Sequence, residues 1–105
     1  MKVIINDKKI DLKICTKFKD RLLGLMFKKN INYCLCFPKC NSIHTFFMKQ
    51  NINVIMTDKN NKILFYFKKL KPWKIILPKK GVYYTYEFTN NIKNIKINDY
   101  VSIKN

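Results

Sequence analysis

The chain has very little of several residue types. Its 105 residues include no alanine, two glycines, three prolines, one arginine and one histidine. We find no low-complexity linker and no internal repeat, so we expect one domain that spans residues 1–105. No apolar run approaches the roughly 20 residues that a membrane helix needs, so no membrane span is predicted.

Acidic residues are also scarce, and this gives the chain a strongly basic balance. Six acidic residues stand against 22 basic ones, a formal net charge of +16. Such a field attracts nucleic acid, anionic lipid or acidic partners. However, the lysines are spread along the whole chain, and arginine occurs only at Arg21. Arginine is the residue whose guanidinium group makes bidentate hydrogen bonds to phosphates and guanine edges. We therefore expect a solvated lysine surface, with nucleic acid as a less favoured partner.

The N-terminal residues do not resemble a secretory signal. Polar residues begin after three apolar ones, at Asn6, far short of an apolar signal core. The expected compartment is the cytoplasm. In that compartment the four cysteines, Cys15, Cys34, Cys36 and Cys40, are expected to be reduced thiols.

Hydrophobic patterning predicts a chain made mainly of strands. Ile10, Leu12 and Ile14 alternate with polar residues, which is typical of a strand with one buried face. Polar turn signals such as the run from Asp58 to Asn61 separate the segments. Strands are predicted at residues 2–5, 10–14, 33–37, 43–48, 54–57, 62–70, 82–89, 92–97 and 100–103.

One helix is predicted, over roughly residues 17–28. Thr16 is its expected N-cap, and Phe18, Leu22, Leu25 and Met26 recur at helical spacing after it. Gly24 lies inside this predicted helix, where glycine costs about 1 kcal/mol relative to alanine. Close approach to another backbone would account for that glycine.

The run from Cys40 to Met48 concentrates the side chains that could do chemistry. It holds the histidine, His44, with one cysteine and one methionine, inside an otherwise apolar segment. It also belongs to an ordered set of motifs. That set is Arg21-x-x-Gly24-Leu25-Met26, Asn41–Met48, Ile52-Asn53-Val54 leading to Asp58, Pro72-Trp73, Tyr86-Glu87-Phe88 and Asn98-Asp99-Tyr100-Val101.

In this order the motifs resemble the small prokaryotic family catalogued as domain of unknown function 192, over roughly residues 8–103. The resemblance implies an α+β fold that is predominantly β, a compact antiparallel barrel-like sheet with one short helix packed on it. It implies no established reaction. The sequence departs from the family pattern at Asn53, where aspartate is usual, and at Asn98, where glycine is usual.

Metal binding is one candidate chemistry. Cys36-x3-Cys40-x3-His44 places three potential metal ligands at regular spacing. Met26 and Met48 would add thioether ligands, and soft sulfur ligands of this kind suit Cu(I). A structural zinc site needs a second ligand pair, which is missing. The favoured interpretation is that these cysteines and methionines are buried hydrophobic residues, with no metal or other cofactor.

Thiol catalysis is a second candidate. Cys40 and His44 could form a thiolate–imidazolium pair. On one extended strand they would lie about 13 Å apart, too far for a hydrogen bond, unless a turn at Asn41-Ser42 brings them together. Asp58, Glu87 and Asp99 are the carboxylates that could orient the imidazole. Whether the protein is an enzyme is left open.

Ligand or partner binding is the interpretation that we favour. An aromatic cleft near His44 would hold a small molecule or a protein, in a non-enzymatic binding or accessory module. We also expect Arg21 to pair with Glu87 or Asp58. The alternatives are single-stranded nucleic-acid binding through the lysine-flanked aromatic strand 83–88, or a thiol- or metal-dependent enzyme that uses Cys40 and His44. The candidate ligand-binding residues are Arg21, His44, Phe46, Met48, Trp73 and Glu87.

Overall fold

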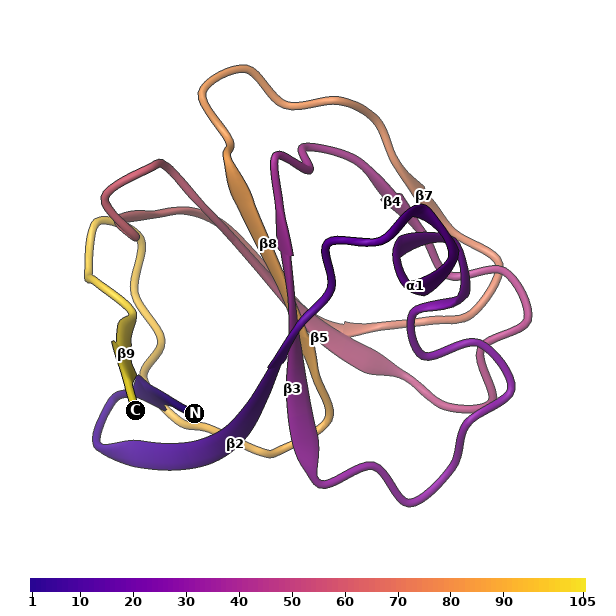
Figure 1. Ribbon diagram of the computed structural model, residues 1–105, viewed down its shortest axis with the longest axis horizontal. Helices are drawn as coiled ribbons and strands as arrows, with labels where there is room; N and C mark the ends of the chain where they lie inside the picture. The colour runs from indigo at the N-terminus through magenta and orange to yellow at the C-terminus, as the bar shows by residue number, and fades with distance from the viewer.

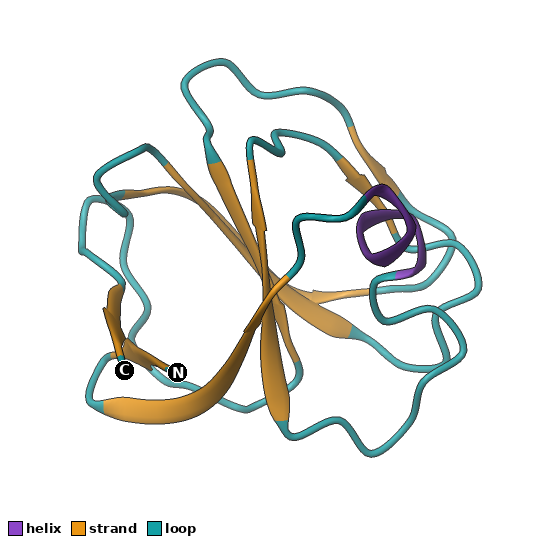
Figure 2. Ribbon diagram, in the orientation of Figure 1, coloured by secondary structure: helices purple, strands orange, loops and turns teal.

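The computed structural model describes the backbone of residues 1–105 and all side chains except those of Phe18, Arg21 and Leu22. Nine strands and one helix follow one another along this chain (Figures 1 and 2). They are β1 (Lys2–Ile5), β2 (Lys8–Ile14), α1 (Phe18–Leu23), β3 (Tyr33–Pro38), β4 (Ile43–His44), β5 (Ile52–Thr57), β6 (Ile63–Leu70), β7 (Ile75–Ile76), β8 (Tyr84–Phe88) and β9 (Ser102–Lys104).

Seven strands form one curled sheet, a half-barrel, in the order β6-β5-β8-β3-β2-β1-β9. The pairs are antiparallel except β2 and β3, which run parallel because the chain crosses over through α1 between them. The ends of the curl meet where the backbone of Ile63 accepts from Asn98 and donates to Asp99, and Lys62 bridges Tyr100. β4 and β7 form a separate two-stranded sheet beside α1 (Figure 1).

The central strands are buried on both faces, so the sheet separates two hydrophobic cores. In β3, Cys34 and Cys36 face the first core, while Leu35 and Phe37 face the second. In β8, the fully buried Tyr86 belongs to the first core. Each fully buried side chain of this size stabilises the fold by about 1.5–3 kcal/mol. Because side chains alternate along a strand, Glu87 must project to the opposite side of β8 from Tyr86, towards the second core.

The predicted helix is much shorter in the structure. α1 ends at Leu23, and Gly24 is its C-cap rather than an interior residue. Its N-cap is Lys17, not Thr16. Leu25 is buried in the turns that follow, so its helical spacing reflected packing in the second core and not continuation of the helix. Phe18 and Leu22, which were expected on the apolar helix face, have side chains outside the described ones.

Two predicted strands are also wrong in extent. The apolar run 43–48 is a strand only at Ile43–His44 and then becomes a turn. Residues 92–97 form no strand and are mostly irregular backbone, with Ile92 inserted into the first core. Conversely, the segment between Pro72 and Pro78, where no strand was predicted, contains the short strand β7. Among the described residues, no helix is long and apolar enough to cross a membrane.

Candidate functional site

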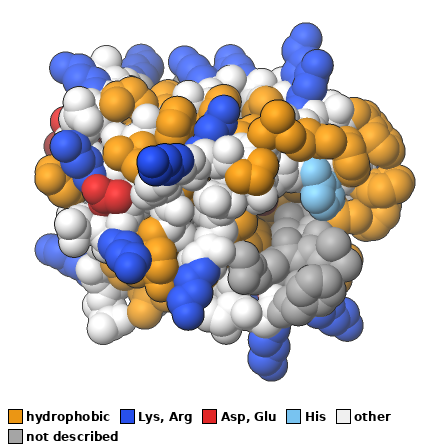
Figure 3. All heavy atoms as spheres, turned by 90° about the horizontal axis from the view of Figure 1, so that it is seen from above, with side chains coloured by type: hydrophobic (Ala, Val, Ile, Leu, Met, Phe, Trp, Pro, Cys, Tyr) orange, Lys and Arg blue, Asp and Glu red, His pale blue; other side chains and the backbone are white. Residues whose placement is uncertain are grey.

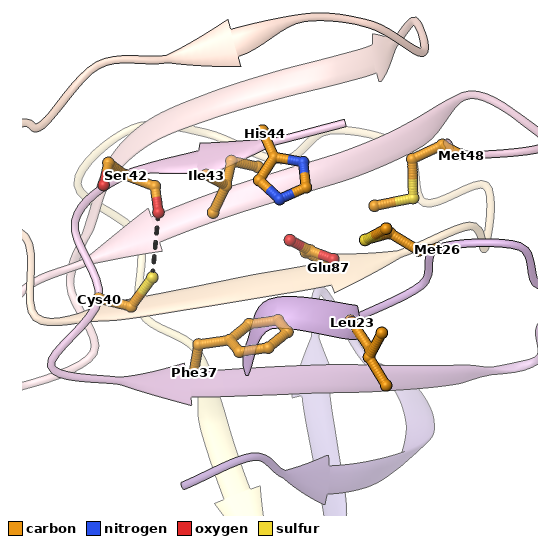
Figure 4. Close-up of a pocket in the computed structure, with 10 residues that line it drawn as sticks. Leu23, Met26, Phe37, Cys40, Ser42, Ile43, His44, Met48 and Glu87 are labelled. Carbon is orange, nitrogen blue, oxygen red and sulfur yellow. Dashed lines mark hydrogen bonds between the residues drawn. The ribbon is translucent and has the colours of Figure 1, made fainter. Parts of the chain in front are cut away.

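A cavity of about 460 Å³ lies between the end of α1, β3, β4 and β8. Its wall is mostly apolar and includes two thioethers and one phenyl ring, with a few polar groups among them (Figure 4). The described lining residues are Leu23, Gly24, Met26, Phe37, Cys40, Ser42, Ile43, His44, Met48 and Glu87. Pockets of this volume with a few convergent polar groups are the usual form of a small-molecule site.

Glu87 supplies the most unusual group in the cavity. It is 3% exposed, and its strand neighbours in the sheet register are Leu35 and Val54, both buried apolar residues. Its Oε1 atom has no hydrogen-bond partner among the described residues. This burial raises the pKa of the Glu87 carboxyl to about 8, so at neutral pH the group is mostly an uncharged acid.

His44 faces Glu87 across the cavity (Figure 4). It ends β4, where its backbone pairs with Ile75 of β7. Its Nδ1 atom accepts a hydrogen bond of 3.2 Å from the backbone N–H of Phe46. Because an accepting Nδ1 carries no proton, the ring is the neutral tautomer with its proton on Nε2. The Nε2–H group is then a donor available to a molecule in the cavity.

Thr45 holds the segment after His44 in place. Its side chain is fully buried, and its hydroxyl donates to the carbonyl of Lys71 at 2.7 Å and accepts from the backbone N–H of Lys74 at 2.8 Å. Its own carbonyl accepts from the backbone N–H of Trp73 at 3.0 Å. These bonds fix the chain from His44 onward against the segment that carries Trp73.

The thiols are in less reactive settings than a catalytic cysteine needs. Burial raises the pKa of Cys34 well above its usual range and that of Cys36 to about 12. The Cys40 Sγ atom lines the cavity but donates to the carbonyl of Ser42 at 3.2 Å (Figure 4). Cys40 and His44 do line one cavity, but the turn after β3 is at Lys39 and not at Asn41-Ser42, where the alternative placed it. Within the described side chains, no group of three His, Cys, Asp or Glu could hold a metal.

The structure distributes the predicted site residues unevenly. His44, Met48 and Glu87 line the cavity. Phe46 and Trp73 instead form a chain of ring contacts that begins at His44, with centroids 5.0 Å apart for His44–Phe46 and 5.7 Å for Phe46–Trp73. The predicted aromatic cleft is therefore an apolar cavity in which Phe37 is the one Phe, Tyr or Trp among the described lining residues. The side chain of Arg21 lies outside the described ones, and so does its predicted pairing with Glu87 or Asp58.

Several lining residues escaped sequence reasoning, chiefly Phe37, Leu23 and Ile43. Each lies in an apolar run and carries no polar signal that would separate it from core residues. The crossover between β2 and β3 brings Leu23 at the end of α1 to Glu87, whereas Phe37 comes from β3 and Ile43 from β4.

Gly24 sits at the cavity wall for a conformational reason. Its φ and ψ are 47° and −123°, and a Cβ there would meet Glu87 Oε1 at 3.5 Å and the Phe37 ring at 3.6 Å. These are ordinary contacts with side chains, so the expected close approach of another backbone is wrong. The glycine is needed because L-residues rarely adopt this backbone conformation.

We expect Gly24→Ala to lower the free energy of unfolding by about 1–3 kcal/mol, because the methyl group forces a strained backbone. Urea unfolding at neutral pH measures the loss. Gly81→Ala is the matched control, since Gly81 also has a positive φ of 86° but lies outside the described cavity lining. Both variants should lose stability, and only Gly24→Ala should also narrow the cavity. A Gly24→Ala protein as stable as wild type would contradict this account.

The family model for domain of unknown function 192 (DUF192), described as an uncharacterised ACR, matches residues 1–103. The chain belongs to this family. The earlier resemblance is thereby confirmed, and the family is one of unknown function.

Archaeal DUF192 relatives are similar in sequence. The UPF0127 protein of Thermococcus sibiricus is 39% identical over 82 residues, which covers 72% of this chain and 53% of that protein. The UPF0127 protein PH1112 of Pyrococcus horikoshii is 39% identical over 89 residues, 79% of this chain and 76% of that protein. The chain thus spans about half the length of the Thermococcus relative.

Two crystal structures share the fold at low sequence identity. A protein of unknown function from Novosphingobium aromaticivorans aligns with a TM-score of 0.79 at 15% identity, covering 97% of this chain and 82% of the other. A putative transcription regulator from Sinorhizobium meliloti aligns with a TM-score of 0.80 at 12% identity, covering 96% and 89%. At these identities the likeness concerns the fold alone.

The two departures from the DUF192 pattern have structural explanations. The Asn53 side chain is 7% exposed, donates to the carbonyl of Asn90 at 2.9 Å and accepts from the backbone N–H of Lys69 at 2.9 Å. Its amide thus connects β6 to the segment after β8. Asn98 has a φ of 77°, a conformation that glycine or asparagine adopts most readily.

Proposed function

We propose that this DUF192 protein is a non-enzymatic binding module that holds a small, uncharged, mostly apolar molecule in the cavity between His44 and Glu87. The observation that carries this proposal is the buried Oε1 atom of Glu87 at the cavity, which has no hydrogen-bond partner among the described side chains. A buried polar atom without a partner costs about 1–3 kcal/mol. A ligand that hydrogen-bonds to this atom would recover that cost.

The polar groups of the cavity specify the ligand's head group. An uncharged Glu87 carboxyl can both donate and accept, and the His44 Nε2–H group donates. A carboxamide complements these groups because its carbonyl accepts and its N–H donates. The wall formed by Leu23, Met26 and Met48 would contact an apolar body. An anionic head is disfavoured, because it would have to share a desolvated site with a carboxyl group that can ionise.

We place the protein in the cytoplasm as part of the same proposal. All four cysteines are free, and Cys15, Cys34 and Cys36 are buried in the two cores. Buried free thiols suit a reducing compartment. The alternative of base stacking along strand 83–88 has less support, since Tyr86 and Phe88 are fully buried in the first core.

General acid–base catalysis is a second candidate for the same cavity. The specific observation in its favour is that an imidazole and a carboxyl group with a pKa of about 8 face one cavity. A pKa near the working pH suits proton transfer. Turnover of a bound amide or ester, lost in Glu87→Gln with binding retained, would favour catalysis over simple binding.

The binding proposal predicts a selective thermal shift. Benzamide should raise the melting temperature at concentrations well above its dissociation constant. Toluene, which has neither donor nor acceptor, and benzoate, which has acceptors but no donor, should raise it less. His44→Phe retains a ring but removes the Nε2–H donor, so benzamide should bind about tenfold more weakly. Tyr84→Phe, which removes a hydroxyl outside the described lining, is the control and should bind as wild type does. Equal shifts with all three compounds, or an unchanged affinity in His44→Phe, would contradict the proposal.

A further inference from the structure

Three aromatic side chains form an exposed cluster that neither core uses, here called the aromatic tip. Phe27, Phe47 and Trp73 are 59%, 46% and 60% exposed. Their rings contact each other, with centroids 5.4 Å apart for Phe27–Phe47 and 4.8 Å for Phe47–Trp73. Three large rings packed together at the surface are unusual, because isolated exposed apolar residues are common but contiguous patches mark interaction sites.

All three residues of the aromatic tip have left-handed backbones. Their φ angles are 63°, 61° and 66° for Phe27, Phe47 and Trp73. Bulky residues are genuine outliers in this region, where glycine or asparagine would be comfortable. The backbone is held there by hydrogen bonds from Phe27 N–H to the Phe47 carbonyl and from Trp73 N–H to the Thr45 carbonyl, both 3.0 Å. These strained backbones present exposed rings that contribute to neither core, so the strain indicates that the rings have a role other than stabilising the fold.

The segments that carry the tip are basic throughout. Residues 25–30, 45–50 and 70–80 contain seven lysines and no aspartate or glutamate. Lys28, Lys49, Lys71 and Lys74, which flank the three rings in sequence, are exposed. On the face shown in Figure 3, hydrophobic side chains gather around the histidine, and the acidic side chains lie at the opposite end.

We propose that the aromatic tip docks on the surface of an anionic lipid bilayer. Exposed aromatic rings insert at the level of the lipid headgroups, and lysines around them are attracted to anionic lipid, each by roughly fivefold in partitioning. This inference goes beyond ligand binding in the cavity and does not depend on it.

The composition of the tip favours a bilayer over nucleic acid or an acidic protein. Ile75 and Leu77 follow Trp73 in the same segment and are 59% and 69% exposed. Aliphatic side chains add contact with hydrocarbon but offer no platform for base stacking. The rings of the tip also pack on each other, which leaves fewer free faces for bases. Lysine suits a diffuse anionic surface, and the arginine, at position 21, lies outside these three segments.

Trp73 is the single tryptophan and therefore reports directly on the tip. Its emission should shift to shorter wavelength with vesicles of phosphatidylcholine and phosphatidylglycerol in a two-to-one ratio, but not with phosphatidylcholine alone. Brominated acyl chains in the mixed vesicles should quench it. Added salt should weaken binding because it screens the lysines.

The variant Phe27→Asn/Phe47→Asn keeps Trp73 and replaces two rings with a residue that tolerates their positive φ. We expect partitioning to fall at least tenfold, with a melting temperature equal to or above that of wild type. Ile97→Asn is the control, since Ile97 is 49% exposed but lies outside the tip, and it should bind as wild type does.

Three results would overturn the proposal. The first is the absence of a spectral shift and quenching with the mixed vesicles. The second is unchanged partitioning in the double variant, which would indicate adsorption by lysines alone. The third is evidence that the tip binds another partner. That evidence would be a dimer in sedimentation velocity that the double variant abolishes, or an oligonucleotide that quenches Trp73 and displaces the vesicles.

Discussion

Glu87→Gln is expected to stabilise the protein near pH 8 and to leave its stability nearly unchanged near pH 5. Wild-type Glu87 is buried between apolar strands, and its pKa is raised from 4.5 to about 8. Glutamine has nearly the same shape and cannot ionise. The substitution therefore removes the cost of a buried charge without opening a cavity in the second core.

The sign of the pH dependence follows from the direction of the shift. Below about pH 4.5 the carboxyl is protonated in both the folded and the unfolded chain, so its contribution to stability is complete. As the pH rises, the unfolded chain loses its proton first, and the folded state is progressively disfavoured until the pH passes about 8. Each pKa unit corresponds to about 1.4 kcal/mol, so the ceiling of the loss is roughly 5 kcal/mol.

Urea unfolding of wild type and Glu87→Gln between pH 5 and pH 8 measures this difference. The gap in unfolding free energy should widen to several kcal/mol in favour of the variant as the pH rises through the range set by Glu87. Asp58→Asn, which changes an acid in the turn before β6, controls for the change in net charge. A Glu87→Gln protein that is less stable than wild type near pH 8 would contradict an uncharged Glu87. It would instead support the predicted ion pair with Arg21.

Asn53→Asp is expected to lower the free energy of unfolding by about 2–4 kcal/mol at neutral pH. The Asn53 amide N–H₂ group donates to the Asn90 carbonyl at 2.9 Å, and the residue is 7% exposed. Aspartate would keep the bond from Lys69 N–H but place a buried carboxylate oxygen against a carbonyl oxygen. The aspartate that the family resemblance implied at this position should therefore be harmful in this chain.

Denaturant unfolding at neutral and acidic pH tests this expectation. Protonation lets the new carboxyl donate to the Asn90 carbonyl, so part of the lost stability should return as the pH approaches the ordinary aspartate pKa of about 4. Asn91→Asp makes the same chemical change at an exposed neighbour and should cost little. Full stability of Asn53→Asp at neutral pH would contradict this account. It would mean that the fold tolerates a carboxylate at position 53, so that a carboxylate there would be available for a function.

The parts of the fold that sequence patterns predicted well are those whose signals are local. The turn from Asp58 to Asn61 separates two apolar runs, and β5 and β6 pair across it as an antiparallel hairpin. The Asp58 side chain accepts hydrogen bonds from the backbone N–H groups of Asn60 and Lys62. Because an aspartate at the start of a turn commonly makes such bonds, the turn could be predicted from the sequence.

The errors occurred where distant contacts decide the local structure. Strand β4 stops after His44 because the Thr45 hydroxyl and backbone bind the segment around Lys71 and Lys74, which lies far along the chain. Nothing in the apolar run 43–48 indicates that constraint. Similarly, Ile92 fills the first core without a partner strand, so the alternation that predicted a strand at 92–97 had another cause.

Of the candidate site, only the chemically distinctive residues could be predicted from the sequence. His44 and Glu87 stand out in composition and belong to the family motifs, and both line the cavity. Their opposition across it depends on where the separate β4–β7 sheet lies relative to β8 (Figure 4), which no pattern in either segment encodes. Trp73 was predicted to line the same site as part of an aromatic cleft, yet it lies in the aromatic tip.

Chemical-shift mapping by NMR with benzamide tests the central claim of a ligand site between His44 and Glu87 most directly. Saturable changes should be largest at the amide signals of Gly24, His44 and Glu87, and in His44→Phe they should need about tenfold more benzamide to saturate. Changes confined to residues outside the cavity, or none at millimolar benzamide, would contradict a binding site at Glu87.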